Sequence, residues 1–121
     1  MNKDQALHSF WSGFNLPAYD ETNVPDDAVF PYITYSVTTD KWETVVNLSA
    51  NLWYRSTSWK DISDKKEQIA QYIGDGKVIK IDGGYMWIVQ GQPFAQRMAD
   101  DTDESVRRIY LNLQAEFLTA Y

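Results

Sequence analysis

The 121-residue sequence contains no cysteine, which excludes disulfide bonds, thiolate nucleophiles and cysteine-ligated zinc or iron–sulfur centres. Positive charge is also scarce, because 11 Lys and Arg face 17 Asp and Glu and leave a formal net charge of -6. Nucleic-acid affinity comes mainly from Lys and Arg that displace counterions, so we expect no tight binding of DNA or RNA. No apolar run approaches membrane-spanning length and the N-terminus is too polar for a signal peptide, which predicts a cytosolic protein without a membrane partner.

Residues suited to catalysis are few. The single histidine, His8, has no Ser, Asp or Cys partner at a known motif spacing, and we expect it to be a solvated surface residue. The acidic run at 100–104 lacks the glycine and the later glutamate of a calcium loop, so we expect a solvated loop tip. The Gly-Asp-Gly-Lys at 74–77 follows a predicted helix and precedes a strand, whereas a phosphate-binding loop has the opposite order. The sequence therefore predicts no enzyme, no metal site and no cofactor.

Apolar spacing predicts two helices. Residues 3–14 carry Leu7 and Phe10 on one face, and Pro17 stops the pattern. Residues 56–76 carry an apolar stripe through Ile69 that ends at a glycine pair. Both segments are amphipathic, so each is expected to cover a sheet.

Alternation of apolar and polar side chains predicts five strands. Two of them, at 31–38 and 45–54, form an antiparallel hairpin with one buried face. Two more form a second hairpin across 77–90, with its turn at an Asp-Gly-Gly. Ile79, Ile81, Met86 and Ile88 are the candidates for the inward faces of that hairpin, and burial of the run 85–89 on both sides is the alternative. The last strand, at 106–117, alternates without interruption.

The remaining segments, 15–29 and 91–105, are predicted to be long loops because of their Pro, Gly and acidic residues. The order helix, two strands, helix, three strands predicts a single α+β domain over 1–121. We expect a two-layer sandwich, with both helices on one face of an antiparallel or mixed sheet of about five strands.

Aromatic residues are abundant, with five Trp and eight Tyr. The predicted strands place Thr, Asn and Gln beside aromatic side chains on the face away from the helices, a mixture that suits a wet protein–protein contact. Core packing, a platform that stacks on sugars or peptides, and an enzyme site invisible in sequence are the alternatives. The candidate interface residues are Tyr19, Trp42, Trp53, Phe94, Arg97, Met98, Asp100, Asp101, Asp103 and Tyr110.

The layout resembles the tail-terminator family of long-tailed phages, also described as tail-completion, minor capsid or neck proteins. The features that carry the resemblance are a "PYI" strand start at 31–33, a long strand ending in "LWYRS" at 52–56, a "GDGKVI" turn at 74–79 and a final strand with "RRIYLNLQAEF" at 107–117.

Several expectations follow from this resemblance. The chain would be a non-enzymatic virion protein, assembled in the host bacterial cytoplasm, that forms a homo-oligomeric ring, commonly a hexamer. The ring would cap the tail tube and join it to a head–tail connector or neck protein. An acidic lumen would let DNA pass through without sticking.

Overall fold

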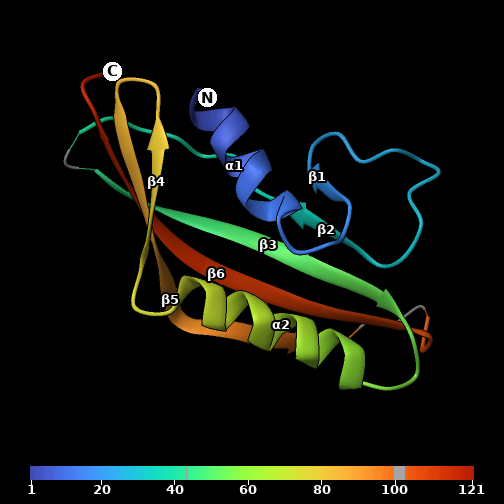
Figure 1. The fold of residues 1–121 in the computed structure, drawn as a ribbon. Coiled ribbons are helices and arrows are strands. Elements are labelled where there is room, and N and C mark those ends of the chain that lie inside the picture. Colours follow the sequence, from blue (N-terminus) through green and yellow to red (C-terminus); the bar gives the residue numbers. More distant parts are fainter. Residues whose placement is uncertain (43, 100–102) are drawn as a thin grey trace.

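The computed structural model describes residues 1–42, 44–99 and 103–121. Within these residues the chain forms two helices and six strands (Figure 1). In chain order they are α1 (Lys3–Ser12), β1 (Ala18–Asp20), β2 (Tyr32–Tyr35), β3 (Val45–Arg55), α2 (Lys60–Ile73), β4 (Lys77–Ile81), β5 (Gly84–Met98) and β6 (Val106–Thr119). The fold is α+β, as the sequence predicts.

The six strands form one mixed sheet in the order β1-β2-β3-β6-β5-β4. Strands β1 and β2 are parallel, and every other neighbouring pair is antiparallel. The predicted strand count and order are wrong at one place, because the presumed loop 15–29 contains β1. Its residues Ala18 and Asp20 pair with Ile33 and Tyr35, a contact between segments that no local pattern reveals.

The antiparallel pairing of the first two predicted strands is confirmed, with Ile33 opposite Leu52. The first strand is much shorter than predicted, however. Its pairing continues only to Ser36, whose backbone N–H donates to Ser49 at 2.8 Å. Residues 37–40, predicted to continue the strand, are exposed and outside regular structure.

The prediction of a loop over 91–105 is wrong for most of its length, because β5 runs on to Met98. Strand β5 stays paired with β6 on both sides of an irregularity, with Gln90 opposite Leu113 and Ala95 opposite Leu111. The four residues between Gln90 and Ala95 therefore bulge out of the ladder. Gly91 makes the bulge sterically possible, since a Cβ at this position would lie 2.7 Å from the carbonyl oxygen of Asn112.

A capping box sets the start of α1, whereas the N-cap residue of α2, Trp59, makes no side-chain capping hydrogen bond. Helix α1 begins with a capping box, in which Asn2 Oδ1 accepts from Gln5 N at 2.8 Å and Gln5 Oε1 accepts from Asn2 N at 2.9 Å. It ends at Ser12, two residues before the predicted end at residue 14. Before α2, Ser58 Oγ accepts from the Lys60 N–H at 3.1 Å.

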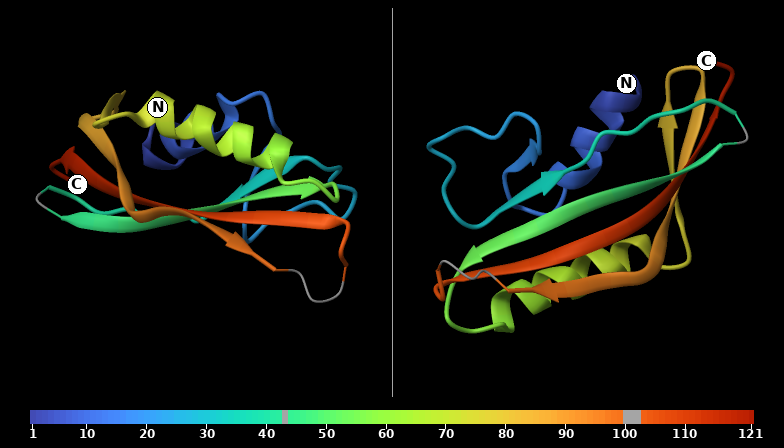
Figure 2. Two further views of the ribbon diagram at one scale, coloured as in Figure 1. Left: turned by 90° about the horizontal axis from the view of Figure 1, so that it is seen from below. Right: turned by 180° about the vertical axis from the view of Figure 1, so that it is seen from behind.

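Both helices lie on one face of the sheet, so the predicted two layers are present (Figure 2). The interface between the layers is a continuous apolar core. Both helices contribute fully buried side chains, such as Leu7 from α1 and Ile69 from α2. The sheet contributes the alternating residues of its central strands, among them Leu52, Leu111 and Phe117. The opposite face of the sheet, here called the outer face, carries neither helix.

Candidate protein–protein interface

The outer face of the sheet is almost free of charge at its centre. The β3 residues that point to this face are Asn47, Ser49 and Asn51, which alternate with the buried Leu48 and Ala50. On β6 they are Tyr110, Asn112 and Gln114, which are directly paired with the β3 amides and hydroxyl. Depletion of charge with retention of hydrogen-bonding groups is typical of protein contact surfaces.

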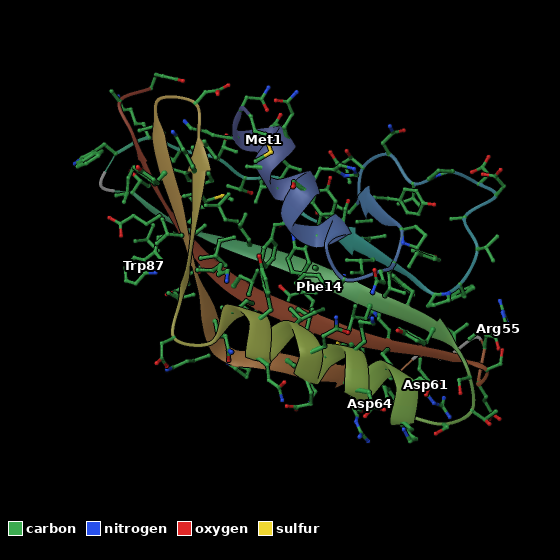
Figure 3. All side chains as sticks on the ribbon, in the orientation of Figure 1. Met1, Phe14, Arg55, Asp61, Asp64 and Trp87 are labelled. Atoms are coloured by element: carbon green, nitrogen blue, oxygen red, sulfur yellow. The ribbon has the colours of Figure 1, made fainter. Side chains whose placement is uncertain are left out.

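An exposed apolar row crosses this face near the β4–β5 turn. Val45 on β3 is opposite Glu116 on β6, Glu116 is opposite Trp87 on β5, and Trp87 is opposite Val78 on β4. The exposed fractions are 57% for Val45, 41% for Trp87 and 61% for Val78, large values for side chains of this size. Trp87 is labelled in Figure 3, on the far side of the hairpin from α2.

One further aromatic side chain extends this apolar row, and a second is exposed near the end of β6. Tyr85, two residues before Trp87 on the same face of β5, is 48% exposed. Trp42, 55% exposed, is held beside the end of β6 because its backbone N–H donates to the Thr119 carbonyl at 2.7 Å. The row includes one charged side chain, Glu116, and Lys80 is paired with Tyr85. Exposed apolar residues gathered in one patch mark a binding surface more strongly than scattered apolar residues do.

Beside the apolar row lies an open hollow of about 860 Å³. Its lining is polar and uncharged and consists of Asn47, Val89, Gln90, Gln92, Tyr110, Asn112 and Gln114. A smaller hollow of about 220 Å³ shares Val89 and Gln114 with it and also contacts Trp87. The apolar row could anchor a partner, and the neighbouring amides could bind water or the partner's backbone. This combination is typical of hydrated protein–protein interfaces.

At the opposite end of the outer face, aromatic rings and arginines form a second row. Tyr19 of β1 contacts Tyr32 of β2 with ring centroids 5.9 Å apart, and Tyr32 stacks on Trp53 of β3 at 6.2 Å. The Arg108 guanidinium lies 5.2 Å from the Trp53 ring. Trp53 Nε1 donates to Thr34 Oγ1 at 2.9 Å, which fixes the indole in the row.

The Trp53–Thr34 hydrogen bond gives a direct test of this row. We expect Trp53→Phe, Thr34→Val and the double variant to show a coupling energy of about 1 kcal/mol in a double-mutant cycle, the usual net value of one hydrogen bond. Urea denaturation of the four proteins measures it. Additive effects of the two substitutions would show that the indole is not held in this position.

Four of the predicted interface residues lie on the outer face. Tyr19 and Trp53 belong to the aromatic row, and Met98 is paired with Arg108 beside it. Tyr110 lines the amide hollow. Trp42 is exposed and lies outside the strands, where its backbone N–H donates to the carbonyl of Thr119 at the end of β6.

Two predicted residues are placed differently from expectation, since both belong to strand β5 rather than to a loop. Phe94 is partly buried against the core, which makes it a packing residue. Arg97 is paired with the inward-facing Ile109, and its guanidinium lies 4.7 Å from the Trp59 ring on the helix side. The bulge in β5 decides both orientations, because it resets which residues of the strand point inward.

Asp103 has specific hydrogen-bond partners, although its side chain is 41% exposed. Its Oδ1 accepts from the Ser105 hydroxyl at 2.6 Å and from the Ser105 N–H at 2.9 Å, and its Oδ2 pairs with Arg55 at 3.2 Å. These Ser105 hydrogen bonds, followed by the Arg55 charge, lower the pKa of Asp103. The other two predicted acids, Asp100 and Asp101, lie outside the described residues.

Histidine His8 has two partners that the sequence does not indicate. Its Nδ1 lies 3.1 Å from the Tyr35 hydroxyl, and its Nε2 lies 3.3 Å from Ser12 Oγ, one helical turn away. A hydrolytic serine also needs donors for an oxyanion in a substrate cleft, and none of the hollows described above includes these residues. Within 1–42, 44–99 and 103–121, no three His, Asp or Glu side chains gather as metal ligands.

Sequence reasoning missed the apolar row as a contact surface. The run 85–89 is not buried on both sides, because Met86 and Ile88 are fully buried while Tyr85 and Trp87 are exposed. The alternation along β5 could have revealed this, because Trp87 lies between Met86 and Ile88 and therefore points to the opposite face of the strand.

The sequence matches no protein-family model and no curated protein sequence. The fold is similar to that of a chain in the solved "Virion of native gene transfer agent (GTA) particle". The TM-score is 0.53 at 15% sequence identity, and the alignment covers 91% of this chain and 82% of that chain. This likeness shows that the two chains share a fold over most of their lengths.

The described part of the chain contains no helix with both the length and the hydropathy needed to cross a bilayer.

Proposed function

We propose that this chain is a non-enzymatic structural protein of a phage-like virion. It assembles into a homo-oligomeric ring, a hexamer, that caps the tail tube and joins it to a head–tail connector or neck protein. The observation that carries the proposal is the exposed apolar row beside the amide-rich centre of the outer face, a combination suited to contact with another protein. The shared fold with a chain of a gene transfer agent virion supports the virion setting.

In this proposal the outer face docks on the tail tube. Trp87 and its apolar neighbours supply the desolvated centre of the contact, where a few large side chains provide most of the binding energy. The amide hollow beside them supplies hydrogen bonds to the partner directly or through water. Neither part needs a charged group, so the contact is expected to tolerate salt.

The acidic character of the chain fits a role around DNA. With a formal net charge of -6, a ring of these subunits repels the phosphate backbone and lets DNA pass without adhering. The proposed location is the virion, with assembly in the cytoplasm of the host bacterium.

Ring formation is tested by light scattering and negative-stain electron microscopy of the purified protein, alone and mixed with its cognate tail tube protein. We expect a mass of about six subunits, annular particles, and tubes that stop growing once capped. A chain that stays monomeric at high concentration, with no ring even beside the tube protein, would contradict the proposal.

A small binding module for glycans or peptides is the second candidate. The amide hollow favours it, because planar amides and Tyr110 are suited to hydrogen bonding and stacking with a sugar. A titration with glycans that shifts the tryptophan emission of wild-type protein but not of Trp87→Phe would support this alternative.

A further inference from the structure

The two margins of the sheet carry opposite charge. The segment 18–31, which contains edge strand β1, has four acids and no Lys or Arg. The strands at the other margin, β4 and β5, carry three bases and no acid: Lys77, Lys80 and Arg97. Counted with the turns on either side of β4, residues 75–98 have three bases and two acids and a formal net charge of +1, against -4 for residues 18–31, so the two margins differ in the sign of their charge.

Acids also flank this basic margin, since Asp75 and Asp82 lie in the turns on either side of β4 and Asp100 and Asp101 follow β5 in the sequence. Asp82, in the β4–β5 turn, is paired with the N-terminal ammonium at 3.1 Å. Asp75 lies in the turn before β4 and is exposed. Lys80 is exposed on β4, and Arg97 is exposed towards the end of β5.

The acidic margin presents its charges outward. Glu21, Asp26 and Asp27 are exposed. Asp20 has a different role, because its carboxylate accepts from Thr22 N at 2.9 Å and from Thr22 Oγ1 at 2.8 Å. These hydrogen bonds order the beginning of the segment after β1 and leave the other three carboxylates available to a partner.

Both margins also have open backbone edges within the described residues. Strand β4 pairs with β5 only over Gly84–Ile88, so residues 89–98 of β5 have no strand beside them on the edge away from β6. The outer edge of β4 is also unpaired with any strand. The outer edge of β1 is open as well. Unpaired strand edges favour the addition of a strand from another chain.

From this polarity we infer that the acidic β1 margin of one copy docks against the basic β4–β5 margin of a second copy, in a head-to-tail contact. The inference rests on the proposed function and specifies how neighbouring subunits of the ring meet. A contact between two different patches is heterologous, and it closes into a ring when the rotation between copies permits. It uses the edges of the sheet, whereas the tail tube is proposed to dock on the outer face, and the two surfaces meet at β4, where Lys80 is paired with Tyr85 and Val78 with Trp87.

Charge exchange tests the contact. We expect Asp26→Lys/Asp27→Lys and, separately, Lys77→Glu/Lys80→Glu to weaken self-association at least about tenfold, because each places like charges opposite each other. An equimolar mixture of the two variants is expected to recover assembly, since every acidic margin then faces a basic one. Rising salt is expected to weaken wild-type assembly, because exposed charges are screened over about 10 Å at 0.1 M ionic strength.

The matched control is Asp61→Lys/Asp64→Lys, which makes the same change in net charge on the exposed side of α2, in the helix layer rather than on the edge strands β1 and β4 (Figure 3). Sedimentation velocity measures assembly, and thermal unfolding verifies that each variant is folded. If the Asp26/Asp27 variant assembles as well as this control, or if the mixture fails to recover assembly, the head-to-tail contact is wrong while the ring proposal stands. A wild-type chain that does not self-associate at low salt, alone or with tube protein, overturns both.

Discussion

Trp87→Ala is expected to lower affinity for the cognate tail tube about 30-fold or more, which corresponds to about 2 kcal/mol of binding free energy. The indole is 41% exposed and lies between Val78 and Glu116 in the cross-strand row, so it provides the largest apolar surface available to a partner there. Ring formation is expected to continue, since the sheet margins are unchanged. Co-sedimentation with preformed tubes and measurement of tube length by electron microscopy give the two readouts.

Tyr72→Ala serves as the control for this loss. Tyr72 is 48% exposed but lies on α2, on the helix side of the sheet, where its ring contacts Phe14. We expect tube binding of this variant to match wild type. If Trp87→Ala binds and caps tubes normally, or if Tyr72→Ala is equally defective, the outer face is not the docking surface.

Gly84→Ala is expected to reduce the free energy of unfolding by about 3 kcal/mol or more. Gly84 begins β5 at φ +158°, and a Cβ there would lie 1.9 Å from the carbonyl oxygen of Leu118. That oxygen belongs to the backbone of β6 and cannot rotate away, so the two strands must separate where Gly84 is paired with Thr119. Urea denaturation followed by circular dichroism measures the change.

Gly13→Ala is the matched control for Gly84→Ala. Gly13 ends α1 at φ -78°, and an added Cβ would come no closer than 3.4 Å to another residue. We expect its effect to stay within about 1 kcal/mol, because alanine adopts this conformation readily. Equal stability of the two variants would mean that β5 and β6 do not approach each other as closely as the register requires.

Local periodicity was sufficient for the long elements. The alternation along 106–117 predicted β6 correctly, and the fully buried Leu111 and Phe117 alternate with partly exposed residues. The stripe through Ile69 likewise predicted α2 and its buried face. These predictions hold because each of these elements buries one side and exposes the other. Apolar residues therefore recur in the sequence with the period of the helix or of the strand.

Local periodicity failed to predict strands that form only because they pair with a segment far away in the sequence. Gly91 and Pro93 are residue types typical of loops. The chain nevertheless remains in the sheet, because Ala95 pairs with Leu111 beyond the bulge. Strand β1 is three residues long and exists because Ala18 lies beside Ile33. No window of neighbouring residues contains that information.

The sequence predicted the composition of the candidate interface but not the position of its apolar row. A polar outer face with amide and aromatic side chains was inferred from the alternation of the strands, and Trp53 and Tyr110 do lie on it. The apolar row was not inferred, since it arises only when Val45, Trp87 and Val78 from three strands are brought into register across Glu116.

The amino-acid sequence by itself determined which side chains each long element turns inward, because that choice depends only on the spacing of apolar residues along one segment. Tertiary structure alone decided the order of the strands, the bulge in β5, the apolar row and the opposite charges of the two sheet margins. These features come from backbone pairing between residues far apart in the chain, and the free energy of such pairing is not encoded in any single segment.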